Sequence, residues 1–85
     1  MSRNTKLFRR ILSGKEANIR FTALRAMLLY LGFEERTHGS HHVFIHRGVK
    51  DLINLQDVRG DAKPYQVRQV RRILLPYGFH LKLDG

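Results

Sequence analysis

Cysteine is absent from this 85-residue chain, and acidic residues are few. Without cysteine, neither a disulfide framework nor a thiolate metal site can form. Long apolar runs are missing as well, because no stretch approaches the roughly 18–20 residues of a membrane span. Residues 1–14 lack the apolar core of a secretory signal. These absences predict a cytoplasmic protein with no membrane association.

The scarcity of negative charge leaves the chain strongly basic. Seven Asp and Glu stand against 16 Lys and Arg, so the formal net charge is +9 and the pI is about 10.9. Such a domain attracts polyanions, and arginine matches phosphate geometry with paired hydrogen bonds. The balance favours RNA as a partner. Ribosome-associated and other soluble basic proteins share it, however, and it says nothing about catalysis.

The length and the 42% hydrophobic content predict one small domain with its own core. Apolar residues at helical spacing predict a helix over residues 22–31. Thr22 is expected to be its N-cap and Gly32 its C-terminal stop, after which Phe33 folds back onto the last turn. Residues 3–13 show helical spacing too, and form either an amphipathic helix or a basic arm that orders on binding.

Three strand signals follow the first long helix. They lie at residues 33–37, 41–46 and 50–56, where β-branched and aromatic residues are frequent. Short turns at residues 38–40 and 47–48 separate them. Sequential strands with short turns predict an antiparallel meander.

A second long helix is expected near the end of the chain. Residues 57–63 are polar and predict a loop, after which Pro64 suits the first turn of a helix. One apolar stripe runs along this helix, which ends by Pro76 and Gly78. Alternation over residues 79–83 predicts a short edge strand.

The fold class expected from these elements is α+β. The order is α-β-β-β-α, with both helices on one face of a three-stranded antiparallel sheet and the other face left for a partner. This is the order of double-stranded RNA-binding domains. We assign residues 19–85 to such a domain and residues 1–18 to a basic N-terminal extension.

Residues 37–46 contain four of the five histidines. Imidazole can take and give a proton near neutral pH, so this run is the candidate catalytic segment. Alternation along the strand puts side chains on two faces. One face carries His41, Val43 and Ile45, and the other carries His42, Phe44 and His46. The first set is the more apolar, so burial can instead hold His41 as a core or turn histidine.

The chain resembles the HicA toxins, the small ribonuclease components of HicA–HicB toxin–antitoxin pairs. The resemblance is carried by Leu31-Gly32-Phe33, by the run Gly39-Ser40-His41-His42-Val43-Phe44, and by the last helix, which ends near Tyr77-Gly78. It extends over roughly residues 20–79. It implies a fold of double-stranded RNA-binding type, cleavage of mRNA without a metal or other cofactor, and inhibition by a HicB-type antitoxin.

The residues at and around the turn have candidate roles in such a reaction. The spacing maps the catalytic histidine of the family to His41, or to His42 where members have one more residue after the serine. Gly39 would let the backbone approach RNA closely. Ser40 would orient the scissile phosphate, or else it only bonds its own backbone as a turn former. His38 either assists as a second titrating group or is a solvated loop residue.

Two features depart from the family pattern. Many members carry Val-Pro-x-His on the third strand, where this chain has Ile53-Asn54-Leu55-Gln56. No role can therefore be transferred to a histidine there. The extension at residues 1–18 is longer than in compact members and receives no role from the resemblance.

Basic residues surround the start and outer side of the last helix. Lys63, Arg68, Arg71 and Arg72 are predicted to bind RNA phosphates, as the start of this helix does in double-stranded RNA-binding domains. A solvated helix face is the alternative interpretation. Tyr65 can stack on a base.

Clustered histidines also raise the possibility of a metal site. His42 and His46 share a face but lie about 13 Å apart along a strand, too far to share an ion. His41 and His42 point apart, so no metal is expected.

Two main functions remain open, an RNA-cleaving toxin and a non-catalytic RNA-binding module. Both predict salt-sensitive RNA binding. Only the enzyme predicts cleavage in EDTA that one histidine substitution removes. A subunit that acts only through a protein partner would show neither property.

Overall fold

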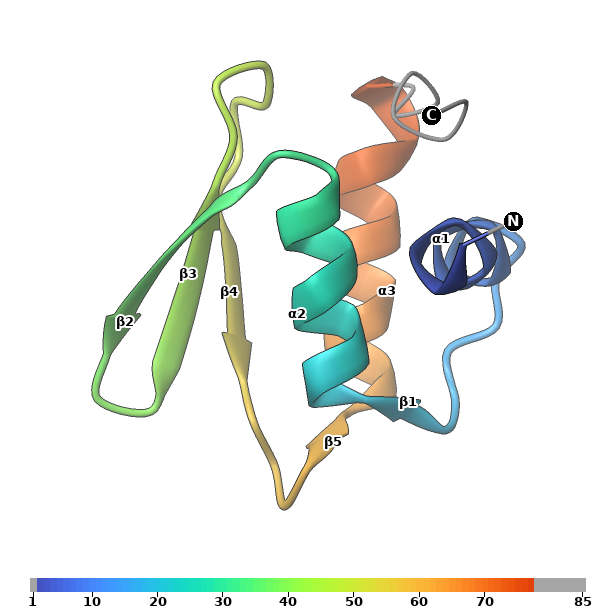
Figure 1. The fold of residues 1–85 in the computed structure, drawn as a ribbon, viewed down its shortest axis with the longest axis horizontal. Helices are drawn as coiled ribbons and strands as arrows, with labels where there is room; N and C mark the ends of the chain where they lie inside the picture. Colours follow the sequence, from blue (N-terminus) through green and yellow to red (C-terminus); the bar gives the residue numbers. More distant parts are fainter. Residues whose placement is uncertain (1, 78–85) are drawn as a thin grey trace.

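Three stretches with apolar residues at helical spacing form the helices of the computed structural model, which describes residues 2–77 (Figure 1). Helix α1 spans Arg3–Leu12, α2 spans Phe21–Tyr30 and α3 spans Pro64–Leu74, followed by the 3-10 turn η1 at Leu75–Tyr77. Together with a three-stranded antiparallel sheet they make an α+β fold. Over residues 2–77, no helix has the length and apolar character to cross a bilayer.

Helix α2 begins one residue before its expected start. Its first residue is Phe21, and no side chain caps it, so the prediction of Thr22 as N-cap is wrong. The Phe21 N–H donates to the Gly60 carbonyl oxygen at 2.9 Å instead. Pairing with a distant strand segment therefore sets the start of the helix, and a capping hydroxyl does not.

The end of α2 is as predicted. Gly32 adopts a φ of 100°, a conformation that a side chain would strain. The Phe33 N–H then donates to the Leu28 carbonyl at 3.0 Å, the reversal typical of glycine-terminated helices. Phe33 is 3% exposed, so the chain turns back into the core at this point.

The predicted meander is confirmed. The sheet has the order β2-β3-β4 and consists of Glu34–His38, His41–Ile45 and Ile53–Gln56. The third strand starts at Ile53 because the chain first turns at Val49, whose N–H donates to the His46 carbonyl at 3.0 Å. The connection therefore covers residues 46–52 and is longer than the expected two-residue turn. The Val49 side chain within it is buried.

The hairpin between β2 and β3 closes on two residues. His38 and His41 face each other in the register, and only Gly39 and Ser40 lie between them. Gly39 has a φ of 61°, and Ser40 has no positive φ, the pattern of a type II′ turn. The expected three-residue turn is therefore one residue shorter, since His38 belongs to the strand.

A second, two-stranded sheet was not expected. β1 (Ile19–Arg20) pairs antiparallel with β5 (Asp61–Ala62), inside the segment predicted to be a loop. Strands of two residues carry no periodic signal that a sequence could reveal. Helix α3 begins at Pro64 as predicted. Gly78 and the edge strand expected over residues 79–83 lie outside the described residues.

The elements are arranged in layers (Figure 1). Helices α2 and α3 cover one face of the sheet, and α1 lies on the side of these helices away from the sheet. Phe8 and Ile11 of α1 are 2% and 0% exposed. Residues 3–12 are therefore a packed helix, and this part of the N-terminal extension shares the core of the domain.

Candidate functional site

The outer face of the sheet, opposite the buried core side chains, carries the candidate site, at the β4 edge that α3 borders. Phe44, Ile53 and Leu55 are buried beneath the helices, whereas His41 and Asn54 on the alternate positions are exposed. His41 is thus not a core histidine, although its face of β3 reads as the more apolar. His42 on the inner face of β3 and His46 just after the strand each pack against a phenylalanine ring.

Two amide side chains of β4 hold the imidazole of His41. Its Nδ1 lies 3.2 Å from Asn54 Oδ1, and its Nε2 lies 3.4 Å from Gln56 Nε2. Since the Asn54 oxygen can only accept and the Gln56 nitrogen can only donate, both contacts fit the neutral tautomer with the proton on Nδ1. The Nε2 lone pair then accepts the hydrogen bond from Gln56 Nε2. Gln56 Nε2 is also 3.5 Å from Ser40 Oγ.

Helix α3 supplies the other wall of a hollow around His41. The hollow has a volume of about 430 Å³, and it opens where β4 meets α3. Tyr65, Gln69 and Arg72 line it from α3, at the i, i+4, i+7 spacing of one helix side. A histidine, two strand amides and a guanidinium thus surround one space.

Gln66 is a buried polar residue in the wall of this hollow. It is 3% exposed, and its Nε2 is 3.4 Å from the Tyr65 hydroxyl oxygen. Its Oε1 is buried without a hydrogen-bond partner among the described residues. An unsatisfied acceptor of this kind destabilises a fold by about 1–3 kcal/mol. Gln66 therefore borders the hollow as a buried amide with one unpaired acceptor.

His38 lies next to His41 on the outer face. The two residues form the closing pair of the hairpin. Directly opposed residues of an antiparallel pair have Cβ atoms about 5 Å apart on the same face. His38 is exposed, so the sheet presents two neighbouring imidazoles to solvent at the turn.

His42 occupies a different environment beneath the sheet. Its Nδ1 lies 2.8 Å from Glu35 Oε2, and Arg25 Nε donates to Glu35 Oε1 at 2.7 Å. The Phe21 ring packs against the imidazole, with 4.7 Å between the centroids. Burial raises the pKa of Glu35, but the hydrogen bonds with His42 and Arg25 outweigh it and hold that pKa below its ordinary value. The cluster of Glu35, His42 and Arg25 thus links strands β2 and β3 to helix α2.

His46 serves the turn after β3. Its Nδ1 accepts a hydrogen bond from the Gly48 N–H at 2.8 Å, and its ring lies 4.9 Å from the Phe33 ring between centroids. These contacts are those of a structural histidine. Over residues 2–77, no group of three His, Asp or Glu side chains converges as metal ligands would.

The four cations predicted to bind phosphate do not share one surface. Arg72 lines the His41 hollow. Arg68 and Arg71 lie on another side of α3, where their guanidinium groups are 2.9 Å and 3.9 Å from the Glu16 carboxylate. Lys63 precedes the first residue of α3 and lines a separate hollow with residues 17–19. Arg72 is therefore the predicted cation that accompanies the histidine.

Sequence reasoning missed the amides around His41. Asn54 and Gln56 alternate with the buried Ile53 and Leu55, so the period of the strand could have placed both on the outer face. Nothing in the sequence gives the register that sets Gln56 opposite His41. Gln66 and Gln69 gave no signal either, because both lie within an ordinary helical pattern.

Comparisons of this chain with protein-family models, curated proteins and solved structures give no match. The geometry around His41 is therefore the basis for assigning a function.

Proposed function

We propose that this chain is a metal-independent endoribonuclease, with His41 as the general acid or base, and that its fold is of the double-stranded RNA-binding type. The observation that carries the proposal is the surroundings of His41. Its imidazole is exposed, held by Asn54 and Gln56, and accompanied by Arg72 in one hollow. The net charge of +9 supports a polyanionic substrate.

The reaction needs few groups. A ribose 2′-hydroxyl takes the place of the Gln56 amide at His41 Nε2, which removes its proton, and the hydroxyl oxygen then attacks the adjacent phosphorus. The bond from phosphorus to the 5′-oxygen breaks, and a general acid protonates that oxygen as it leaves. His38 stands next to His41 and can supply this proton as the general acid. Arg72 offers charge to the phosphoryl oxygens, and the Gly39-Ser40 turn offers amides and a hydroxyl.

In this proposal the protein is the toxin of a toxin–antitoxin pair. The substrate is mRNA in the cytoplasm, and a HicB-type antitoxin restrains the enzyme. The support is the resemblance carried by Gly39-Ser40-His41-His42 and Leu31-Gly32-Phe33. Tyr65, which is 61% exposed beside the hollow, offers a stacking surface for a base.

The test is cleavage of a labelled RNA in EDTA by the purified chain and its variants. His41→Ala should lower the rate by about 10²–10⁴-fold and leave the unfolding transition in place. His42→Ala is the matched control on the other face, and its folded fraction should retain the activity of the parent chain.

Two outcomes would contradict the assignment. Full cleavage by His41→Ala, with loss in folded His42→Ala, would transfer the role to His42. RNA binding by the parent chain without any cleavage would favour the non-catalytic RNA-binding module.

A further inference from the structure

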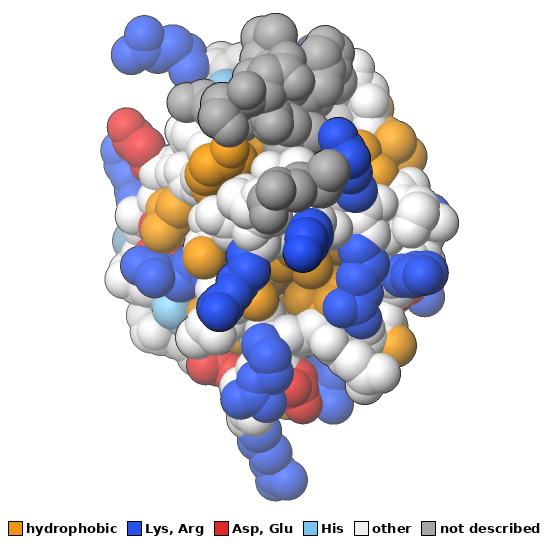
Figure 2. Space-filling view, turned by 45° about the vertical axis from the view of Figure 1, so that its right-hand side comes forward, with side chains coloured by type: hydrophobic (Ala, Val, Ile, Leu, Met, Phe, Trp, Pro, Cys, Tyr) orange, Lys and Arg blue, Asp and Glu red, His pale blue; other side chains and the backbone are white. Residues whose placement is uncertain are grey.

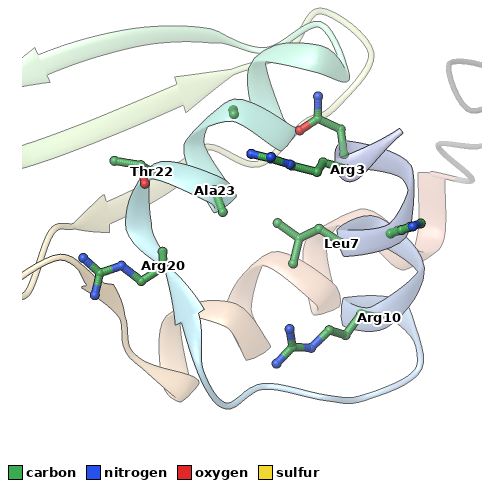
Figure 3. A pocket seen from close by; sticks show the side chains of 9 residues that line it. Arg3, Leu7, Arg10, Arg20, Thr22 and Ala23 are labelled. Atoms are coloured by element: carbon green, nitrogen blue, oxygen red, sulfur yellow. The ribbon is translucent and has the colours of Figure 1, made fainter. Parts of the chain in front are cut away.

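A basic groove with an apolar floor lies between α1 and α2 (Figure 3). Its volume is about 560 Å³, and it shares no lining residue with the His41 hollow. Leu7 points from α1 toward α2, where Ala23 lies opposite, and Ala26 of α2 lines the same groove. The two alanines are three residues apart on one helix side, and their small side chains leave the space that forms the groove.

Four cations surround this floor. Arg3, Lys6 and Arg10 line the groove from α1, and Arg20 lines it from β1. Figure 3 shows Arg3 extending from α1 toward α2 on one side of Leu7, and Arg10 on the other side, where it extends toward the connection between α1 and β1. Figure 2 shows Lys and Arg side chains gathered around exposed apolar side chains on the α1 side of the molecule. The groove thus combines an apolar centre with a positively charged rim.

Few carboxylates of the described residues pair with the cations of this rim. Within residues 2–77, no ion pair involves Arg3, Lys6 or Arg10, although Arg10 donates to the Ala17 carbonyl at 2.7 Å. Arg20 pairs with Asp61 at 3.1 Å, and both side chains are more than half exposed. An exposed pair of this kind is weak and can exchange for another carboxylate.

The groove fits an acidic peptide better than other occupants. An RNA backbone would have to place phosphates over the methyl groups of Leu7, Ala23 and Ala26, which cannot replace their hydration. Among the described residues that line the groove, none is an aromatic on which a base could stack. A second copy of the chain would bring a net charge of +9 to a basic surface.

We propose that the α1–α2 groove binds an acidic, amphipathic segment of a partner protein. An apolar side chain of the segment lies on Leu7 between Ala23 and Ala26, and flanking carboxylates pair with Arg3, Lys6 and Arg10. The proposal does not depend on ribonuclease activity. It gives helix α1 a role in recognition in addition to its role in the core.

The test uses the isotope-labelled full chain and three probes followed by NMR. The probes are a short synthetic peptide of glutamates with leucines at helical spacing, the same peptide with serine for leucine, and a single-stranded DNA oligonucleotide. The glutamate–leucine peptide should shift the amide signals of Leu7, Ala23 and Ala26. The serine peptide should bind about tenfold more weakly or worse, because it lacks the apolar contact.

Substitutions separate the rim from the floor. The double variant Arg3→Glu with Lys6→Glu should lose at least about tenfold in affinity for the glutamate–leucine peptide. The single variants Lys6→Glu and Arg9→Glu make the same change of charge and are the matched pair, since Arg9 is exposed on α1 and does not line the groove. Ala26→Leu fills the floor without a change of charge and should weaken binding as well.

Three results would overturn the proposal. These are equal losses in Arg9→Glu and in Lys6→Glu, stronger shifts of the groove amides with DNA than with the peptide, and peptide shifts confined to the outer sheet face. Peptide binding should persist in His41→Ala, so failure at the groove is distinct from failure of the proposed catalytic site.

Discussion

His41 and His42 are adjacent in the chain, yet their imidazoles have different surroundings. Side chains alternate along β3, so His41 faces solvent beside two amides and a guanidinium, and His42 faces a helix. The Glu35 carboxylate binds His42 and Arg25 together, which joins β2, β3 and α2. Proton transfer to a substrate is open to His41, and a structural role suits His42.

The Glu35 cluster should make stability depend on pH. The folded pKa of Glu35 is lowered, so its contribution is present above the unfolded pKa of about 4.3 and is lost as pH falls through the folded pKa. Glu35→Gln should therefore reduce the free energy of unfolding by about 1–3 kcal/mol at pH 7. The difference in the free energy of unfolding between Glu35→Gln and the parent chain should become smaller toward pH 3.

Urea unfolding of both chains at a series of pH values measures this difference. Glu34→Gln is the control on the same strand, because Glu34 is exposed and makes no ion pair with the described residues. A destabilisation by Glu35→Gln that is the same at pH 7 and pH 3 would rule out the carboxylate as its cause.

Gln66 offers a second prediction about a single residue. Gln66→Met keeps the approximate volume and removes the unpaired buried acceptor, at the expense of one long contact to Tyr65. The free energy of unfolding should stay within about 1 kcal/mol of the parent value or increase. RNA affinity should fall several-fold, because the amide borders the His41 hollow.

Thermal unfolding and RNA titration of Gln66→Met give the two values. Gln69→Met serves as the comparison, since Gln69 lines the same hollow without a buried unpaired atom. A large loss of stability together with unchanged RNA affinity would identify Gln66 as a structural residue only.

Helix α1 is joined to the domain through its apolar side. Ser2 accepts a hydrogen bond from the Thr5 N–H at 3.1 Å and so caps the helix, and Thr5, Phe8 and Ile11 are buried. One side of α1 packs into the core, and another side presents cations. The extension is consequently both a structural element and a candidate recognition surface.

Truncation of Phe8 tests this attachment. Phe8→Ala should lower the free energy of unfolding by about 3–5 kcal/mol, because a large side chain that is 2% exposed leaves a cavity. The loss should appear in the single cooperative transition of the whole domain, measured by circular dichroism in urea. Arg9→Ala, on the exposed side of α1, should change little. An unchanged transition in Phe8→Ala would show that α1 is not part of the folding unit.

The basic charge of the molecule is distributed over separate sites. Glu16, which follows α1, faces Arg68 and Arg71, while Arg72 remains at the His41 hollow and the α1 cations surround their own groove. The net charge of +9 draws polyanions toward the whole surface. If the proposed ribonuclease activity holds, contacts with a bound RNA depend on which cations stand beside His41.

Salt dependence should distinguish these cations. Arg72→Ala should reduce the slope of log affinity against log salt by about 0.7–0.9, because one phosphate contact is lost. Arg68→Ala should change the slope less, since Glu16 already pairs with Arg68 at 2.9 Å. RNA titrations over a salt series, with His41 replaced to prevent cleavage, provide both slopes. A larger effect of Arg68→Ala would place the RNA on the Glu16 side of α3.

Local properties of the sequence determined much of the fold. The spacing of apolar residues predicted α2 and α3, Gly32 predicted the end of α2, and the Gly39-Ser40 turn predicted the hairpin. Each of these depends on neighbours within a few residues, because backbone conformation and side-chain period act over that range. The basic character and the histidine run are likewise legible in the sequence alone.

Only the tertiary structure decided which of these residues meet. Asn54 reaches His41 across 13 residues, and Glu16 reaches Arg68 across 52. The choice between the two faces of β3 was made by the helices that cover His42 and Phe44, and the start of α2 by the Gly60 carbonyl. Strand register and helix packing are set by such distant contacts, and no local pattern encodes them.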